Sequence, residues 1–131
     1  MKKMIVTVML AVATASVPML AHHSFAAEYD AKKPVTLKGT VTKVDWRNPH
    51  VYFFIDVTDE QGKPVNWALE MGPPAGLQRA GWTKNTMKVG DEVVVEGTRA
   101  KDGSNLANAR TVTMASTGEK LGAASSQGAT Q

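Results

Sequence analysis

The chain contains three histidines, His22, His23 and His50, and no cysteine. His22 and His23 are adjacent and directly follow a segment that ends at Ala21. Cleavage after Ala21 would give a chain that begins with a free α-amine beside two imidazole rings. Nitrogen ligands of this kind favour Cu(II), in tetragonal geometry, over Mg²⁺ or Ca²⁺. Because binding needs neutral imidazoles and a deprotonated amine, we expect the affinity to fall as the pH drops.

His50 is the third candidate ligand of this metal site. It follows the turn signal Arg47-Asn48-Pro49 and opens a segment in which apolar residues alternate. The apolar positions are odd-numbered, so His50 is expected on the opposite face, at the mouth of the loop between the first two strands. A folded-back N-terminus could reach it there. Two other interpretations stay open: His22 and His23 are solvated on a flexible terminus, and His50 only caps a turn or bonds to a neighbouring strand.

A second candidate surface is aromatic. Its residues lie on the face away from the predicted core, in two neighbouring strands: Tyr52, Phe54, Asn66 and Glu70. Two exposed rings beside an amide and a carboxylate could stack a sugar, a peptide or an aromatic small molecule. In the alternative interpretation the N-terminal segment or the helix covers these rings, with Phe25 or Tyr29 as the packing partner.

Residues 1–21 have the three parts of a secretory signal peptide. Lys2 and Lys3 form a basic start, and residues 4–12 are apolar but fewer than the roughly 20 that span a bilayer. Small residues and Pro18 then lead to Ala21. We therefore expect export to the periplasm or beyond, with no stable membrane insertion after cleavage. The absence of cysteine excludes a disulfide framework in that oxidising compartment.

Charge and motif content narrow the function further. Removing Lys2 and Lys3 from the 15 basic residues leaves 13 against 12 acidic ones, without the basic patch that nucleic-acid binding needs. The sequence has no cysteine nucleophile, no Gly-x-Ser-x-Gly elbow and no glycine-rich loop between a strand and a long helix. We therefore expect a non-catalytic module that binds a small ligand or an envelope protein, copper being the candidate cofactor.

Periodicity predicts an all-β domain over residues 22–115. Five segments have the character of strands: residues 35–42, 51–57, 65–71, 93–98 and 109–114. The alternation slips between Val41 and Val44, which predicts a bulge or bend in the first strand. Residues 75–80 follow two prolines and predict a short helix.

Three strands, a short helix and two more strands is the order of an OB-fold. We therefore predict a small five-stranded OB-like barrel with one short helix between strands three and four, preceded by the signal peptide. A five- or six-stranded open sandwich is the competing architecture. Residues 22–33 are expected to be an irregular N-terminal segment. Residues 116–131, rich in Ser, Gly, Ala, Thr and Gln, are expected to be a disordered tail.

Short motifs succeed one another along the chain: His22-His23-Ser24-Phe25, Glu28-Tyr29-Asp30, Val35-x-Leu37-x-Gly39-Thr40-Val41, Trp46-x-Asn48-Pro49-His50, Trp67-x-Leu69-Glu70, Gly81-Trp82 and Gly90-Asp91-x-Val93-x-Val95. Over roughly Ala21 to Leu121, their order and spacing resemble the small exported bacterial proteins grouped as domain of unknown function 6152. Residues 116–119 depart from that family, which tends to have an Asp-Gly turn there. The resemblance implies export and one compact β-domain, and it implies no activity.

Overall fold

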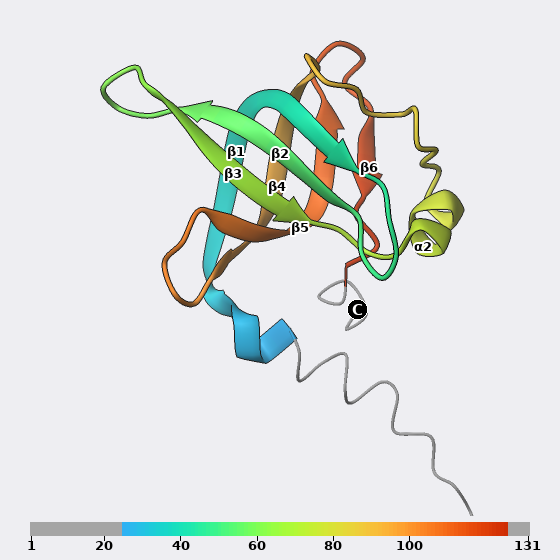
Figure 1. Ribbon diagram of the computed structural model, residues 1–131, viewed down its shortest axis with the longest axis horizontal. Helices are drawn as coiled ribbons and strands as arrows, with labels where there is room; N and C mark the ends of the chain where they lie inside the picture. Colours follow the sequence, from blue (N-terminus) through green and yellow to red (C-terminus); the bar gives the residue numbers. More distant parts are fainter. Residues whose placement is uncertain (1–24, 126–131) are drawn as a thin grey trace, which may run out of the picture.

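A computed structural model describes residues 25–125 of the 131-residue chain. This part of the chain is an all-β fold with only short helices (Figure 1). Its elements are β1 (Tyr29–Asp45), β2 (Tyr52–Thr58), β3 (Pro64–Glu70), α2 (Pro74–Arg79), β4 (Glu92–Ala100), β5 (Leu106–Met114) and β6 (Lys120–Gly122). Residues 25–28 are helical and lead directly into β1. Within residues 25–125, no helix is long and apolar enough to cross a membrane.

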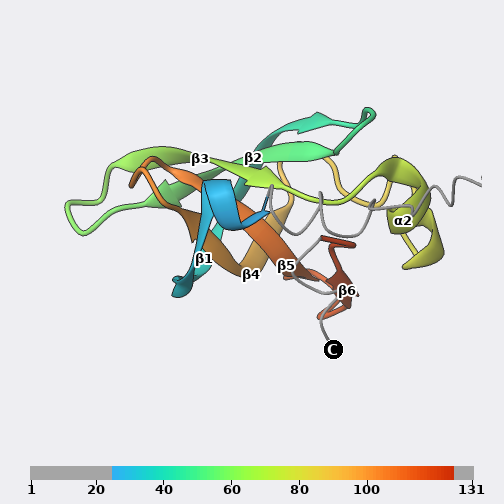
Figure 2. The same cartoon turned by 90° about the horizontal axis from the view of Figure 1, so that it is seen from below.

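The strands lie in the order β3-β2-β1-β4-β5-β6, and neighbours in this order are antiparallel. β1 is long enough to serve two partners: Tyr29–Thr40 pairs with β4, and Thr40–Asp45 pairs with β2. β3 also pairs in parallel with β5, from Ala68 with Leu106 to Glu70 with Asn108. Figure 2 shows the result, with β2 and β3 above β4 and β5.

The core is made of apolar side chains that face inward from all of these strands. Its largest fully buried members are Trp82, Phe53, Ile55, Leu69, Met71 and Leu77. Burying each side chain of this size contributes roughly 1.5–3 kcal/mol. The odd-numbered residues of 51–55 and 67–71 are all buried, so the predicted faces of β2 and β3 are confirmed. The predicted helix is also present as α2, shifted by one residue at each end.

The predicted irregularity in the first strand is a bulge at Thr42. Val41 pairs with Ile55 and Lys43 pairs with Phe54, so Thr42 has no opposite residue in β2. An extra residue reverses the faces of the strand beyond it. Val44 can therefore pack against the same core as Val41, although the two are three positions apart.

The expectation of an irregular segment over residues 22–33 is wrong for its described part. Residues 25–28 are helical, and residues 29–33 belong to β1. Tyr29 pairs with Ala100, and its ring is buried. Residues 30–33 are mostly exposed and polar, so they show no alternation from which a strand could be predicted.

The expectation of five strands and of a tail from residue 116 is also wrong, because β6 pairs with β5. Leu121 is only 8% exposed and Ala123 is fully buried. The indole nitrogen of Trp82 donates to the carbonyl of Gly122 at 2.9 Å, and the amide of Gly72 donates to that of Ala123 at 2.8 Å. Two apolar residues thus join the core from a segment of tail-like composition. Residues 126–131 of the predicted tail lie outside the described residues.

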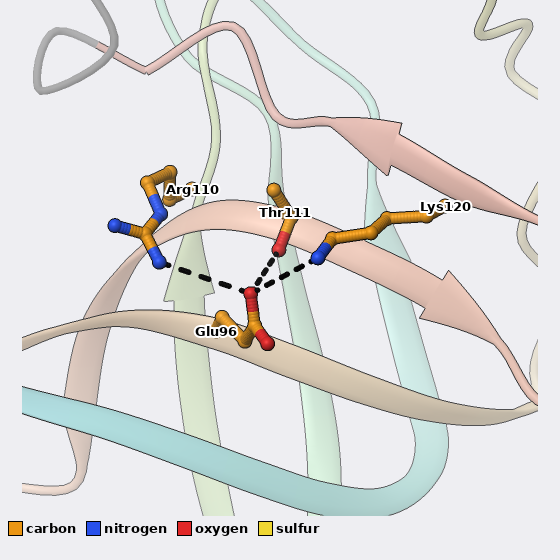
Figure 3. Close-up of polar contacts among 4 residues, drawn as sticks. All are labelled: Glu96, Arg110, Thr111 and Lys120. Atoms are coloured by element: carbon orange, nitrogen blue, oxygen red, sulfur yellow. Dashed lines mark hydrogen bonds and ion pairs between the residues drawn. The ribbon is translucent and has the colours of Figure 1, made fainter.

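A polar contact on the outer side ties β6 to β4 and β5 (Figure 3). Thr111 Oγ1 donates to Glu96 Oε2 at 3.0 Å, Lys120 Nζ lies 3.4 Å from the same oxygen, and Arg110 Nη2 lies 3.8 Å from it. The hydrogen bond from Thr111 and the charge and hydrogen bond of Lys120 hold the pKa of Glu96 below its ordinary value. Glu96 is therefore ionised at neutral pH and connects its own strand, β4, to β5 and β6.

Candidate functional site

A buried carboxylate, Glu70, organises a group of polar side chains at the end of β3. The Tyr29 hydroxyl donates to Oε2 of Glu70 at 2.5 Å. On the other oxygen, Nδ1 of His50 lies 2.7 Å from Oε1. Each carboxylate oxygen thus has its own partner, as a buried charge requires. With Glu28 and Tyr52, which interact electrostatically with Glu70, these residues form what we call the Glu70 cluster.

Separate parts of the chain supply the members of the Glu70 cluster. Tyr29 is the first residue of β1, His50 lies in the loop before β2, and Glu70 is the last residue of β3. Tyr52 is directly opposite Glu70 in the β2–β3 register. Phe25 stacks on Tyr29 with ring centroids 5.5 Å apart, so the helical residues 25–28 lie against the cluster.

The Glu70 cluster is negative and partly shielded from water. Burial, followed by the hydrogen bond to Glu70, raises the pKa of Tyr29 far above its ordinary value. Burial and the charge of Glu70 raise the pKa of Tyr52 to about 12. Burial, then the charge of Glu70, raises the pKa of the Glu28 carboxyl, while His50 opposes this shift. Both phenols are therefore neutral hydrogen-bond donors at neutral pH.

These shifts predict the alkaline behaviour of the only two tyrosines in the chain, Tyr29 and Tyr52. Both tyrosines have a higher pKa in the folded chain than in the unfolded chain, where the pKa of tyrosine is 10.0. The stability that these groups contribute is therefore present below pH 10 and is lost as the pH rises toward 12. Phenolate absorbance should half-develop near pH 10 in denaturant and near pH 12 for Tyr52 in the folded protein.

The variant Tyr52→Phe isolates the signal of Tyr29 in the same titration. It should leave no phenolate absorbance until the protein unfolds. A folded protein in which either tyrosine ionises at its ordinary pKa would show that the hydroxyl is not held against Glu70.

The structure brings together only some of the residues predicted for the two sites. His50, Tyr52 and Glu70 meet in one cluster, although they were expected to act at two separate sites. Asn66 lies nearer the start of β3, and its Nδ2 donates to Asp56 Oδ1 at 2.9 Å. Phe54 contacts a cation instead, with Nζ of Lys43 5.5 Å from its ring centroid. The predicted four-residue aromatic face is therefore divided between separate contacts.

The two remaining predicted metal ligands, His22 and His23, lie outside the described residues. Within residues 25–125, no group of three or more His, Asp or Glu side chains is arranged to hold a metal ion. His50 and Glu70 alone are thus an incomplete donor set for a metal.

Tyr29 and Glu28 were not predicted as site residues. Tyr29 was considered only as a packing partner for the aromatic face, and it does lie there as a hydrogen-bond donor to Glu70. Tyr29 and Glu70 are 41 positions apart, so no local pattern links them. One sequence signal could have identified them: Glu28 and Tyr29 belong to one of the motifs that carry the family resemblance.

In a comparison with family sequence models, the model of the family of unknown function DUF6152 matches residues 9–109. The chain belongs to this family. The resemblance to DUF6152 seen in the order of the motifs is thereby confirmed. The DUF6152 match includes every member of the Glu70 cluster and ends before β6. No curated protein and no solved structure matches this DUF6152 chain.

Proposed function

We propose that this protein is an exported, non-catalytic binding module that holds a Cu(II)-type ion at His50. It would act in the periplasm or be secreted, after removal of residues 1–21. Its architecture would be an OB-like barrel, which the parallel pairing of β3 with β5 supports because that contact joins two separated strands of the sheet.

The contact between His50 and Glu70 is the observation that carries the proposal. Because a carboxylate only accepts hydrogen bonds, Nδ1 of His50 carries the proton that faces Oε1, at 2.7 Å. The lone pair is then on Nε2, on the other side of the ring. Carboxylates orient metal-binding imidazoles in this way and raise their basicity. The His50 side chain is 46% exposed while that of Glu70 is 9% exposed, so the ring extends from a buried anchor toward solvent.

The N-terminal histidines would supply the other nitrogen ligands. His22 and His23 are two to three residues before Phe25, whose ring stacks on Tyr29 of the Glu70 cluster. One residue of chain spans at most about 3.6 Å, so the covalent connection limits how far both histidines can lie from Phe25. The negative charges of Glu28 and Glu70 also favour a cation there over an anion.

A Cu(II) titration of the protein purified with its natural N-terminus tests this proposal. Native mass spectrometry should give one bound ion and the cleavage site, and electron paramagnetic resonance should give nitrogen hyperfine structure. We expect His50→Ala to weaken binding more than tenfold and to simplify the hyperfine pattern. Glu70→Gln should weaken it about 10- to 100-fold, as loss of an orienting partner does elsewhere.

Two further preparations serve as controls in the titration. Asn66→Ala, on the same sheet but in the Asp56 contact, should bind copper like the unaltered protein. One residue added before His22 should weaken binding, because it displaces the α-amine. Weak copper binding that is unaffected by His50→Ala would show that the N-terminus binds copper only adventitiously. This result would refute the proposed site.

The alternative function is docking of an envelope protein on the face of Tyr52 and Phe54. The described contacts give it less support, because both rings are half-buried beneath cations. The guanidinium of Arg47 lies 5.9 Å from the Tyr52 centroid, and Lys43 lies over Phe54. Loss of a captured partner in Phe54→Ala, with copper binding unchanged, would favour this alternative.

A further inference from the structure

A cavity lies between the helical residues 25–28 and the strands β1 and β4. It is a cleft of about 670 Å³, within the size range of small-molecule sites. Neither His50 nor Glu70 lines it, although Tyr29 does. The cleft therefore differs from the proposed metal site in its lining, and the two share Tyr29.

Two irregularities in strand pairing flank this cleft. On one side of β4, Tyr29 pairs with Ala100 and Pro34 next pairs with Thr98, so residues 30–33 of β1 bow away from their partner strand. On the other side, the β4–β5 register shifts at Gly97, which leaves Arg110 as an extra residue of β5. Gly97 and Thr98, between the two bulges, both line the cleft. Bulges of this kind often reshape a sheet beside a binding site.

The walls of the cleft combine apolar surface with positive charge. The apolar side chains at its lining are Phe25, Ala26, Ala31, Pro34 and Val35. Three cations line it as well: Lys32 from the bowed part of β1, Arg110 from the bulge of β5, and Lys101 directly after β4. The bulges therefore place two of the three cations at the cavity that they open.

The two carboxylates that line the cleft are already engaged. Asp30 Oδ1 accepts a hydrogen bond from the backbone amide of Lys32 at 3.0 Å. Glu96 is the outer-face carboxylate that Thr111 and Lys120 contact more closely than Arg110 does (Figure 3). Within residues 25–125, Lys32 and Lys101 form no ion pair, so their charges are available to a ligand.

We propose that this cleft binds a small organic anion with an apolar ring, of the aromatic carboxylate class. The ring packs against Phe25 and Val35, where it loses contact with water. The carboxylate lies toward the three cations, and the Arg110 guanidinium offers donors beyond its single long contact with Glu96. An inorganic anion would leave the apolar wall unused, and a neutral aromatic molecule would leave the cations unused.

Titration of the copper-free protein with naphthoate, followed by amide chemical shifts, tests this inference. The uncharged amide of naphthoic acid has nearly the same shape and is the matched probe. We expect saturable shifts at Gly97, Thr98 and Val35 with naphthoate and at least tenfold weaker binding of the amide. Acetate, which lacks the ring, should give no saturable shifts.

A charge-matched pair of variants separates this cleft from general attraction to a basic protein. Lys32→Gln with Lys101→Gln should weaken naphthoate binding at least tenfold. Lys63→Gln with Lys84→Gln removes the same charge from exposed positions outside the cleft and should leave binding unchanged. Equal affinity for naphthoate and its amide, equal effects of the two double variants, or shifts centred on His50 would each overturn the inference.

Discussion

Removal of residues 116–131 is expected to lower the free energy of unfolding by about 5 kcal/mol, a large part of the 5–15 kcal/mol typical of a domain. The segment supplies β6, whose Leu121 and the adjoining Ala123 are part of the core. Loss of a buried leucine side chain alone costs about 2–5 kcal/mol. Deleting the strand also exposes the core surface that Leu121 covers.

Hydrogen bonding adds to this loss. The Trp82 indole donates to Gly122, and the Gly72 amide donates to Ala123. A buried donor left without its acceptor costs about 1–3 kcal/mol unless water replaces the acceptor. Lys120 would also be lost from its contact with Glu96, but that contact is solvent-exposed and contributes little.

Urea unfolding monitored by tryptophan fluorescence and circular dichroism measures this effect. Removal of residues 126–131 alone is the matched control, because it leaves β6 and its contacts in place. Leu121→Ala should give an intermediate loss. A truncated protein with the urea midpoint of the full chain would show that the core is complete without β6.

Gly97→Ala is expected to destabilise the fold by about 3 kcal/mol, at the upper end of the cost of overpacking. A Cβ at this position would lie 2.2 Å from the carbonyl oxygen of Asn108 and 3.2 Å from Cα of Ala109. These are backbone atoms of β5, so they cannot rotate away as a flexible side chain could. The two strands would have to separate where their register shifts.

Gly122→Ala is the control for Gly97→Ala, since no heavy atom lies within 4 Å of the added Cβ. It should change the free energy of unfolding by less than about 1 kcal/mol, in line with an uncrowded surface change. Urea midpoints of the two variants provide the comparison. Equal midpoints would contradict the close approach of β4 and β5 at the cleft.

The alternation of apolar and polar residues was most informative about which side chains of a strand face the core. Alternation assigned Phe53 and Leu69 to the core, and the same parity placed Tyr52 and Glu70 together on the opposite face. Their cross-strand pairing is expected because one short loop joins β2 to β3 and fixes the register. Local periodicity and turn residues are sufficient to predict neighbours on adjacent strands of a hairpin.

Contacts between distant segments could not be predicted in this way. Glu70 was expected to be an exposed ligand, yet Tyr29 covers it from 41 positions away. Tyr29 reaches Glu70 because β1 continues along β4 as far as Ala100. Residues 29–33 have no period-two pattern from which this continuation of the strand could be predicted. Leu121 was missed for a related reason: one leucine among small polar residues has a weak signal until the surface that it covers is known.

β6 is the last of the described strands, and this position has a consequence for the order in which the core is completed during synthesis. The ribosome synthesises Leu77 and Trp82 well before Leu121, so the core of the nascent chain stays incomplete until β6 has been made. β6 pairs locally with β5, but its contacts with Trp82 and those of Ala123 with Gly72 are non-local, and non-local contacts are slow to form. If the protein is exported as proposed, late closure of the core would favour crossing of the translocation channel before folding is complete.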